Sequence, residues 1–289
     1  GLVKGANQGE GMGNQFLSHI RQVDAVVQMV RCFHDLNVPH AFDTIEPQRD
    51  METIDFELVL ADLDVVEKRL ERIQKQSKGK KTNDEEQVAL EKIKPCLEEG
   101  RFATKANLNE KEIFAVKSLG LLTLKPMIYA FNVDESQLSE PQTLLETVQP
   151  YTTEMGGLAI PICAQLDYEM LALTEAERHE MLQALGLEAT GLNRLIQATY
   201  RLLNLVTFLT AGEPEVRAWS ITQGMHAQRA AREIHSDIER GFIRAEVTAF
   251  KDLMSCGNPV AAKEKGLVRL EGKEYLVKDG DVIHFRFAV

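Results

Sequence analysis

The sequence lacks the features that mark several classes of protein. No run approaches the ~18 uninterrupted apolar residues that a membrane span needs. The chain begins without Met and shows neither a basic-then-apolar signal segment nor an Arg/Ser-rich transit pattern. Its cysteines form no Cys-x-x-Cys pair, which argues against a zinc site and a disulfide framework. The four cysteines are Cys32, Cys96, Cys163 and Cys256. We expect no membrane partner and a reducing, cytoplasmic location, with an organellar form left open.

The composition is that of an ordinary globular chain with an uneven charge. Hydrophobic residues make up 44% and charged residues 27% of the 289 residues, which excludes a mostly disordered chain and leaves room for two domains. The net charge of −11 argues against a general nucleic-acid coat. Residues 212–289 hold 12 basic and 12 acidic side chains, so the first 211 residues carry the whole excess of acid. This asymmetry indicates two modules.

Three short apolar runs are typical of buried parallel strands. They are Ala25–Val30, Met127–Phe131 and Leu158–Ile162, and helical patterns lie between them. This order predicts an α/β fold, in which ligands bind beyond the carboxyl ends of the strands. The polar residues that follow each run are therefore the first candidates for a site.

A helical hairpin is predicted over residues 51–100, between the first two strands. One apolar seam steps by four and three residues, and a shorter seam follows it. These seams are Val59, Leu63, Val66, Leu70 and Ile73, and then Leu90, Ile93 and Leu97. Asn83 and Glu86 have capping-box spacing at the second helix, which Pro95 should kink or delay.

The tip of this hairpin is rich in lysine. Lys75, Lys78, Lys80 and Lys81 fall within seven residues. A solvated tip and a contact with a phosphate backbone are equally good interpretations.

A second module follows, over residues 206–289. We expect a strand at Val216–Ile221, a helix at Ala227–His235 and a hairpin that joins residues 268–270 to 275–277. Ile283, Phe285 and Phe287 alternate with polar residues, as in a half-buried final strand. A small mixed sheet packed on one helix, as in a ubiquitin-like β-grasp, fits this pattern.

The loop after the second strand contains a candidate base-reading motif. Asn132-Val133-Asp134-Glu135 stands where P-loop GTPases carry Asn-Lys-x-Asp. The Asp of that motif accepts hydrogen bonds from guanine N1–H and the N2 amino group, donors that adenine lacks on that edge. Here Glu135 takes the Asp position and Val133 replaces the Lys. A longer carboxylate without the Lys should discriminate less well in favour of guanine.

Two further segments fit the same pattern. Cys163-Ala164 follows the third strand, where such folds place a loop of small residues whose backbone N–H supports the base. Gly1-Leu2 is similar to the end of Asp-x-x-Gly, whose Gly donates to the γ-phosphate and precedes a water-orienting Gln. Leu2 cannot polarise water, so another group must do so.

Taken together, these motifs resemble the Obg-like ATPase family, the YchF subfamily of P-loop GTPase-like proteins. The matching segments, which span essentially the whole chain, are residues 1–6, 9–14, 132–135, 210–212, 216–219, 234–237, 241–247 and 278–281. The resemblance implies a nucleotide-binding G domain over 1–50 and 101–205, a coiled-coil insert over 51–100, and a TGS domain of β-grasp type over 206–289.

The resemblance also implies a function. A family member is expected to hydrolyse ATP to ADP and phosphate in preference to GTP, with Mg²⁺ and K⁺ as candidate cofactors, and to act as a monomeric switch in translation or stress response. The ribosome or its RNA would be the partner. His40 matches a family His proposed to act in hydrolysis, because a His near pKa 6.5 can orient water. A plain surface His is the alternative, and His34 is the second candidate.

One departure from the family pattern is important. The phosphate-binding motif G-x-x-x-x-G-K-[ST] is absent, so we expect no metal ligand here and neither tight ATP binding nor hydrolysis by these residues alone. Apolar surface should be exposed at the edge of the central sheet. The alternative function is a non-catalytic adaptor that binds RNA or the ribosome and carries a vestigial nucleotide domain.

Overall fold

The chain forms two compact units, residues 1–199 and 200–289. The computed structural model describes residues 12–76, 84–212 and 215–288, with backbone alone at 12–14. Gly1, Leu2, Lys78, Lys80 and Lys81 lie outside these ranges. None of the described helices is long and apolar enough to cross a bilayer.

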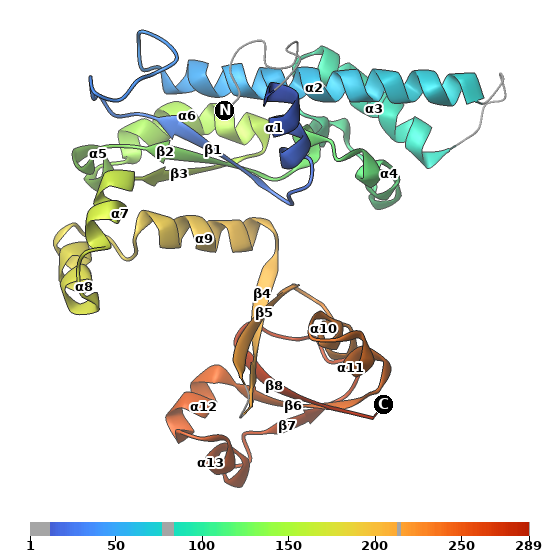
Figure 1. Cartoon of the computed structure of the whole chain (residues 1–289), viewed down its shortest axis with the longest axis vertical. Helices are drawn as coiled ribbons and strands as arrows, with labels where there is room; N and C mark the ends of the chain where they lie inside the picture. The colour runs from blue at the N-terminus through green and yellow to red at the C-terminus, as the bar shows by residue number, and fades with distance from the viewer. Residues whose placement is uncertain (1–11, 77–83, 213–214, 289) are drawn as a thin grey trace. The chain divides into compact units, whose positions relative to one another are not determined.

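The first unit is built on a three-stranded parallel sheet in the order β1-β2-β3 (Figure 1). The strands are β1 Val26–Arg31, β2 Met127–Asn132 and β3 Leu158–Ile162. Val26 pairs with Met127, and Ile128 pairs with Leu158. The predicted α/β sheet is therefore confirmed, and all three carboxyl ends lie at one edge.

Helices cover the two faces of this sheet. On one face, α2 (Pro47–Gln76) contacts β1, α6 (Gln142–Met155) contacts β3, and the two helices contact each other. On the other face, α9 (Gly191–Leu202) approaches β3 so closely that a side chain at Gly191 would meet Ile162. The described helices leave part of this second face uncovered.

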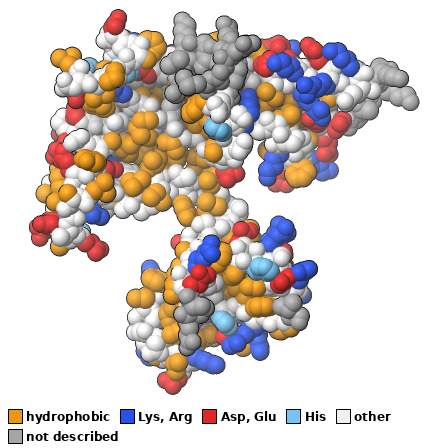
Figure 2. All heavy atoms as spheres, viewed as in Figure 1, with side chains coloured by type: hydrophobic (Ala, Val, Ile, Leu, Met, Phe, Trp, Pro, Cys, Tyr) orange, Lys and Arg blue, Asp and Glu red, His pale blue; other side chains and the backbone are white. Residues whose placement is uncertain are grey.

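The uncovered part of this face is apolar, as predicted for the edge of the sheet. Val27 and Met29 on β1 are 41% and 56% exposed. Hydrophobic side chains gather over this region of the first unit in Figure 2.

The predicted helical hairpin is confirmed. α2 and α3 (Glu85–Glu98) pack together through their apolar seams, and Val59, Val66 and Leu90 are almost fully buried. Arg69 donates to both carboxylate oxygens of Glu86 at 2.7 Å, which fixes α2 against α3.

The predicted cap of α3 needs correction. The N-cap is Asp84, whose side chain accepts from the Glu86 N–H, in place of Asn83, the expected cap, which lies outside the described residues. The helix begins one residue later, and the carboxylate at its N-terminus also suits the helix dipole. Pro95 lies inside α3 and does not delay its start.

The remaining elements of the first unit are short. They are α1 Met12–Ile20, η1 Ala103–Ala106, α4 Glu110–Val116, η2 Lys117–Leu119, η3 Leu122–Leu124, α5 Glu135–Ser139, α7 Ala164–Met170 and α8 Glu175–Ala184.

The second unit is a mixed five-stranded sheet in the order β5-β4-β8-β6-β7. Its strands are β4 Leu205–Ala211, β5 Val216–Thr222, β6 Phe242–Ala249, β7 Arg269–Glu271 and β8 Asp281–Phe287. β4 and β8 are parallel, and the other pairs are antiparallel. Its core is separate from that of the first unit and contains Phe208, Ile221 and Phe285.

Two predictions for this unit are wrong in detail. The single helix expected at Ala227–His235 is broken into α10 Ala227–Ala230, η4 Ala231–Glu233 and α11 Ser236–Arg240. The hairpin between 268–270 and 275–277 does not form, because β7 pairs with β6 while Leu276 bridges to His226. Two helices not predicted, α12 Phe250–Cys256 and α13 Pro259–Glu264, precede β7.

Candidate functional site

The carboxyl ends of the three parallel strands are joined by hydrogen bonds. The Cys32 N–H donates to the Asn132 carbonyl and the Val133 N–H to the Ile162 carbonyl, each at 2.8 Å. The Asn132 side chain reaches the next loop, where its Oδ1 accepts from the Ala164 N–H at 3.0 Å. Asn132 therefore holds the two loops that follow β2 and β3 together.

These loops line a cavity of about 440 Å³. Five of the predicted nucleotide-binding residues lie on its wall, namely Asn132, Val133, Glu135, Cys163 and Ala164. Phe33, His34, Asp35 and Glu169, which sequence reasoning did not assign to nucleotide binding, line it too. The volume lies within the range of small-molecule sites.

Two adjacent acidic residues at the start of α5 differ in their hydrogen bonds. Asp134 is the N-cap: its Oδ1 accepts from the Gln137 N–H at 2.9 Å and from the Ser136 hydroxyl at 2.6 Å. These hydrogen bonds lower the pKa of Asp134. The exposed Glu135 carboxylate has no hydrogen-bond partner in the described part of the chain. Glu135 is therefore free to contact a ligand.

Cys163 and Ala164 form the small-residue wall of the cavity. Cys163 is 3% exposed, and its burial raises the pKa of the thiol. A buried, protonated thiol is a poor nucleophile and metal ligand, so small size is the property that this position uses.

The loop after β1 forms the opposite wall and is held by Arg31. The guanidinium donates to the carbonyls of Phe33, Asp35 and Val38 at 3.1, 2.8 and 2.8 Å. It also lies over the Phe33 ring at 4.5 Å from its centroid. Sequence analysis did not identify Arg31 as part of the site. No local sequence pattern indicates that an Arg at the end of a strand will bind backbone carbonyls several residues further along the chain.

The two candidate histidines lie in different places. His34 lines the cavity, near enough to Asp134 to help lower its pKa. His40 does not line it: its Nε2 lies 3.0 Å from Asp50 Oδ2, and its Nδ1 lies 3.1 Å from the Phe42 carbonyl. Both ring nitrogens of His40 are thus engaged by the protein. Its proposed role in hydrolysis stays a prediction.

Of the predicted lysine tip, only Lys75 is described. Its ammonium group lies 3.4 Å from Glu71 on α2, and the side chain is 78% exposed. Such an exposed pair contributes little to stability.

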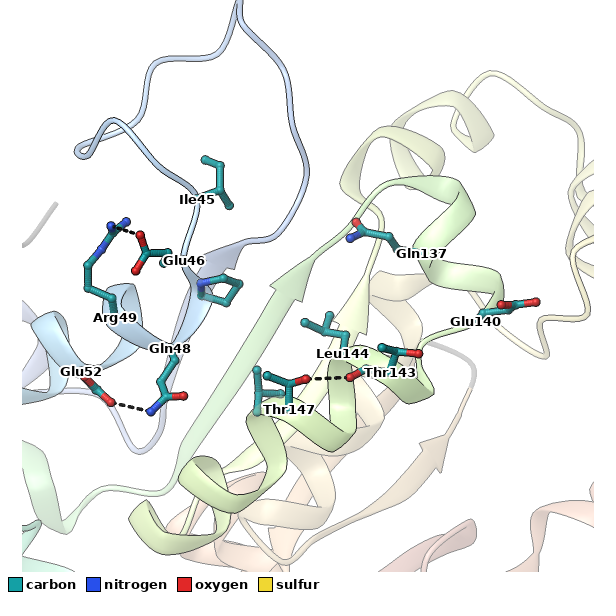
Figure 3. Close-up of a pocket in the computed structure, with 12 residues that line it drawn as sticks. Ile45, Glu46, Gln48, Arg49, Glu52, Gln137, Glu140, Thr143, Leu144 and Thr147 are labelled. Carbon is teal, nitrogen blue, oxygen red and sulfur yellow. Dashed lines mark hydrogen bonds and ion pairs between the residues drawn. The ribbon is translucent and has the colours of Figure 1, made fainter.

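A larger cavity of about 780 Å³ lies between the start of α2 and α5–α6 (Figure 3). Its polar side chains bind one another: Arg49 pairs with Glu46 at 3.0 Å, and Gln48 donates to Glu52 at 2.8 Å. Because these groups satisfy each other, they are less available to a ligand than Glu135.

The described residues do not fit a metal site. Across residues 12–76, 84–212 and 215–288 no group of three His, Cys, Asp or Glu side chains could hold an ion. Mg²⁺ and K⁺ therefore stay predictions, and no step below depends on either.

Comparisons with known proteins identify relatives along the whole chain. A family model, YchF-GTPase_C, described as a protein of unknown function (DUF933), matches residues 205–288. The Ribosome-binding ATPase YchF of Bacillus subtilis is 47% identical over 295 residues, and the match covers 100% of this chain and 80% of that protein. The Escherichia coli O157:H7 protein of the same name is 45% identical over 290 residues, with the same coverage.

Solved structures give the same result. The Schizosaccharomyces pombe YchF GTPase superposes with a TM-score of 0.82 at 33% identity, over 99% of this chain and 77% of that one. A GTP-binding protein of Pyrococcus horikoshii, with a TM-score of 0.60 at 17% identity, shares the fold. Relatives of this identity and coverage establish the relationship, and the chain belongs to the YchF family.

Proposed function

We propose that this chain is the nucleotide- and partner-binding body of a ribosome-associated nucleotide hydrolase that prefers ATP to GTP. The observation that carries the proposal is the Asn132–Ala164 hydrogen bond, which closes the cavity beside the free Glu135 carboxylate. The names of the relatives, ribosome-binding ATPases, support the same activity and partner.

The base preference follows from hydrogen-bond chemistry. Guanine offers two adjacent donors, which a short Asp carboxylate accepts together. Adenine offers one amino donor, which the longer Glu135 carboxylate accepts, while the Ala164 region supports the base from the third loop. Because Glu135 is longer than Asp by one methylene, we expect its two oxygens to be out of line with the two guanine donors, and a donor left unpaired in a partly closed cavity is unfavourable.

Hydrolysis also depends on how the attacking water is activated. Hydrolysis of ATP to ADP and phosphate requires a group that orients water, and His40 remains our candidate, with His34 second. For His40 to act, its ring must exchange the contact with Asp50 or Phe42 for one with water. Nucleotide-driven rearrangement of loops would then act as the switch in translation.

The test is the ratio of ATP to GTP affinity, measured by saturation-transfer NMR with the two nucleotides in competition. We expect weak binding overall, a preference for ATP, and a five- to tenfold fall in that preference for Glu135→Asp. Glu169→Asp, on the same cavity wall, is the matched control and should leave the ratio of ATP to GTP affinity unchanged. An unchanged ratio in Glu135→Asp would contradict the proposal.

Ribosome association is tested separately, by cosedimentation at increasing salt with and without ATP. Nucleotide-dependent cosedimentation supports the switch. Ribosome binding that does not depend on nucleotide favours the alternative, a non-catalytic adaptor.

A further inference from the structure

The outer face of the β6–β8 ladder in the second unit carries an unusual set of charges. Arg244 and Arg286 lie directly opposite each other on the two strands, and Glu246 lies opposite His284. These four residues alternate with the buried Ala245 and Phe285. They therefore project away from the core, on the other face of the sheet.

Like charges directly opposite each other destabilise a β-ladder. Glu246, the acid on this face of the ladder, compensates only one of the two arginines: Arg286 donates to it at 3.0 and 3.3 Å. That contact, with help from His284 and Lys263, lowers the pKa of Glu246. The side chains of Arg244, His284 and Lys263 have no ion pair or hydrogen bond of their own among the described residues.

A cavity of about 410 Å³ lies beside these cations, lined by residues of the sheet and of helices α12 and α13. His284, Lys263 and Glu246 stand at its wall, and the rest of the lining is largely aliphatic. The aliphatic side chains include Leu253, Val260, Val268 and Val282. Val260 is 67% exposed.

We propose that this face, comprising Arg244, Arg286, His284 and Lys263 with the adjoining aliphatic cavity, binds an acidic protein segment that inserts an apolar side chain. The cations pair with carboxylates of the segment and so relieve the Arg244–Arg286 repulsion. The cavity holds the apolar side chain, which supplies the anchor typical of peptide recognition.

The lining favours a protein segment over RNA. Single-stranded RNA is held by stacking of its bases on aromatic rings, and none of the described residues that line this cavity is Phe, Tyr or Trp.

The test uses the whole 289-residue chain and fluorescence anisotropy. The probe is a fluorescein-labelled peptide of six glutamates and two leucines. We expect Arg244→Glu and Lys263→Glu each to weaken its binding about tenfold and Val260→Ser about threefold. Lys273→Glu is the control, because its carbonyl accepts from α10, on the opposite side of the sheet, and it should change binding less than twofold.

Two comparisons make the outcome decisive. A peptide with serine in place of leucine should bind at least fivefold more weakly, and a labelled twelve-uridine RNA more weakly than the original peptide. The proposal is overturned if the RNA binds more tightly, if the serine peptide binds equally well, if Lys273→Glu weakens binding as much as Lys263→Glu, or if the original peptide does not bind at 1 mM. Thermal unfolding of each variant confirms that it is folded.

Discussion

Arg31 shows how one side chain shapes the candidate site. Its guanidinium donates to four carbonyls, those of Phe33, Asp35, Val38 and Pro39, in the loop that walls the cavity at the carboxyl ends of the strands. No other single donor in that loop does the same.

We predict that Arg31→Met speeds amide hydrogen exchange in residues 33–38 about tenfold. Losing charge-assisted hydrogen bonds worth roughly 1.5 kcal/mol would open the loop more often. Arg178→Met is the matched control, because Arg178 binds the carbonyls of Met170 and Leu173 in another loop. Equal exchange of 33–38 in Arg31→Met and the unaltered chain would refute this role.

Asp55 is a buried acid at the contact between α2 and the sheet. Its Oδ2 accepts from the hydroxyls of Tyr129 and Tyr151 at 2.6 and 2.8 Å, and Oδ1 has no partner. Burial raises its pKa from 3.8 to about 6, the two tyrosines oppose that shift, and Glu52 adds to it.

This raised pKa gives a pH prediction with a definite sign. Because the folded-state pKa is above the unfolded one, the stabilising contribution of Asp55 is complete below pH ~4 and is lost as pH rises through ~6. The free energy of unfolding of Asp55→Asn should therefore gain ~2–3 kcal/mol relative to the unaltered chain between pH 4 and 7. Urea denaturation at several pH values measures this. Glu180→Gln, an exposed acid, should show no such gain.

At the level of elements, α2 is fixed to the rest of the first unit by Asp62. Its Oδ2 accepts from the Thr123 N–H and hydroxyl at 2.7 and 2.8 Å, and its Oδ1 from Arg21 at 2.9 Å. Asp62 is fully buried. One carboxylate thus joins α2 to η3 and to the segment after α1.

We predict that Asp62→Ala lowers the free energy of unfolding of the first unit by about 3–5 kcal/mol, because it leaves Arg21 and Thr123 without their partner. Asp64→Ala, two residues along the same helix, breaks only an exposed pair with Lys68 and should cost less than ~1 kcal/mol. Urea denaturation followed by far-ultraviolet circular dichroism measures both. Similar losses for the two variants would rule out the anchoring role.

At the level of the whole molecule, the two units have separate cores. Trp219 is the single tryptophan of the chain and belongs to the second unit, where it stacks on Phe208 and donates to Thr210. Its fluorescence therefore reports the second unit alone.

We predict that the two units unfold independently. Asp62→Ala should lower the urea midpoint of the circular dichroism transition of the first unit and leave the Trp219 fluorescence midpoint unchanged. A common shift of both midpoints would show that the units unfold as one.

Much of the fold and part of the site were predictable from the sequence. The strand at Leu158–Ile162 has the predicted bounds, and the α2 seam at Val59 and Val66 is buried, because periodicity records which face of an element meets the core. The loop at Asn132–Glu135 was recognisable because its residue types follow a buried strand in a fixed order. The break in the helix at 227–240 was not predictable from the sequence. The absence of the hairpin was not predictable either, since β7 pairs with β6, whose residues lie over twenty positions earlier in the chain.

The sequence by itself therefore determined the α/β order, the helical insert, the second β-rich module and the polar loop at Asn132–Glu135 after the second strand, all of which depend on neighbouring residues. The tertiary structure decided that Asn132 reaches Ala164, that Arg31 holds its loop, and that Asp55 is buried between two tyrosines. It also decided that Arg244 faces Arg286. These contacts depend on strand register and helix placement, which bring together residues that no local pattern relates.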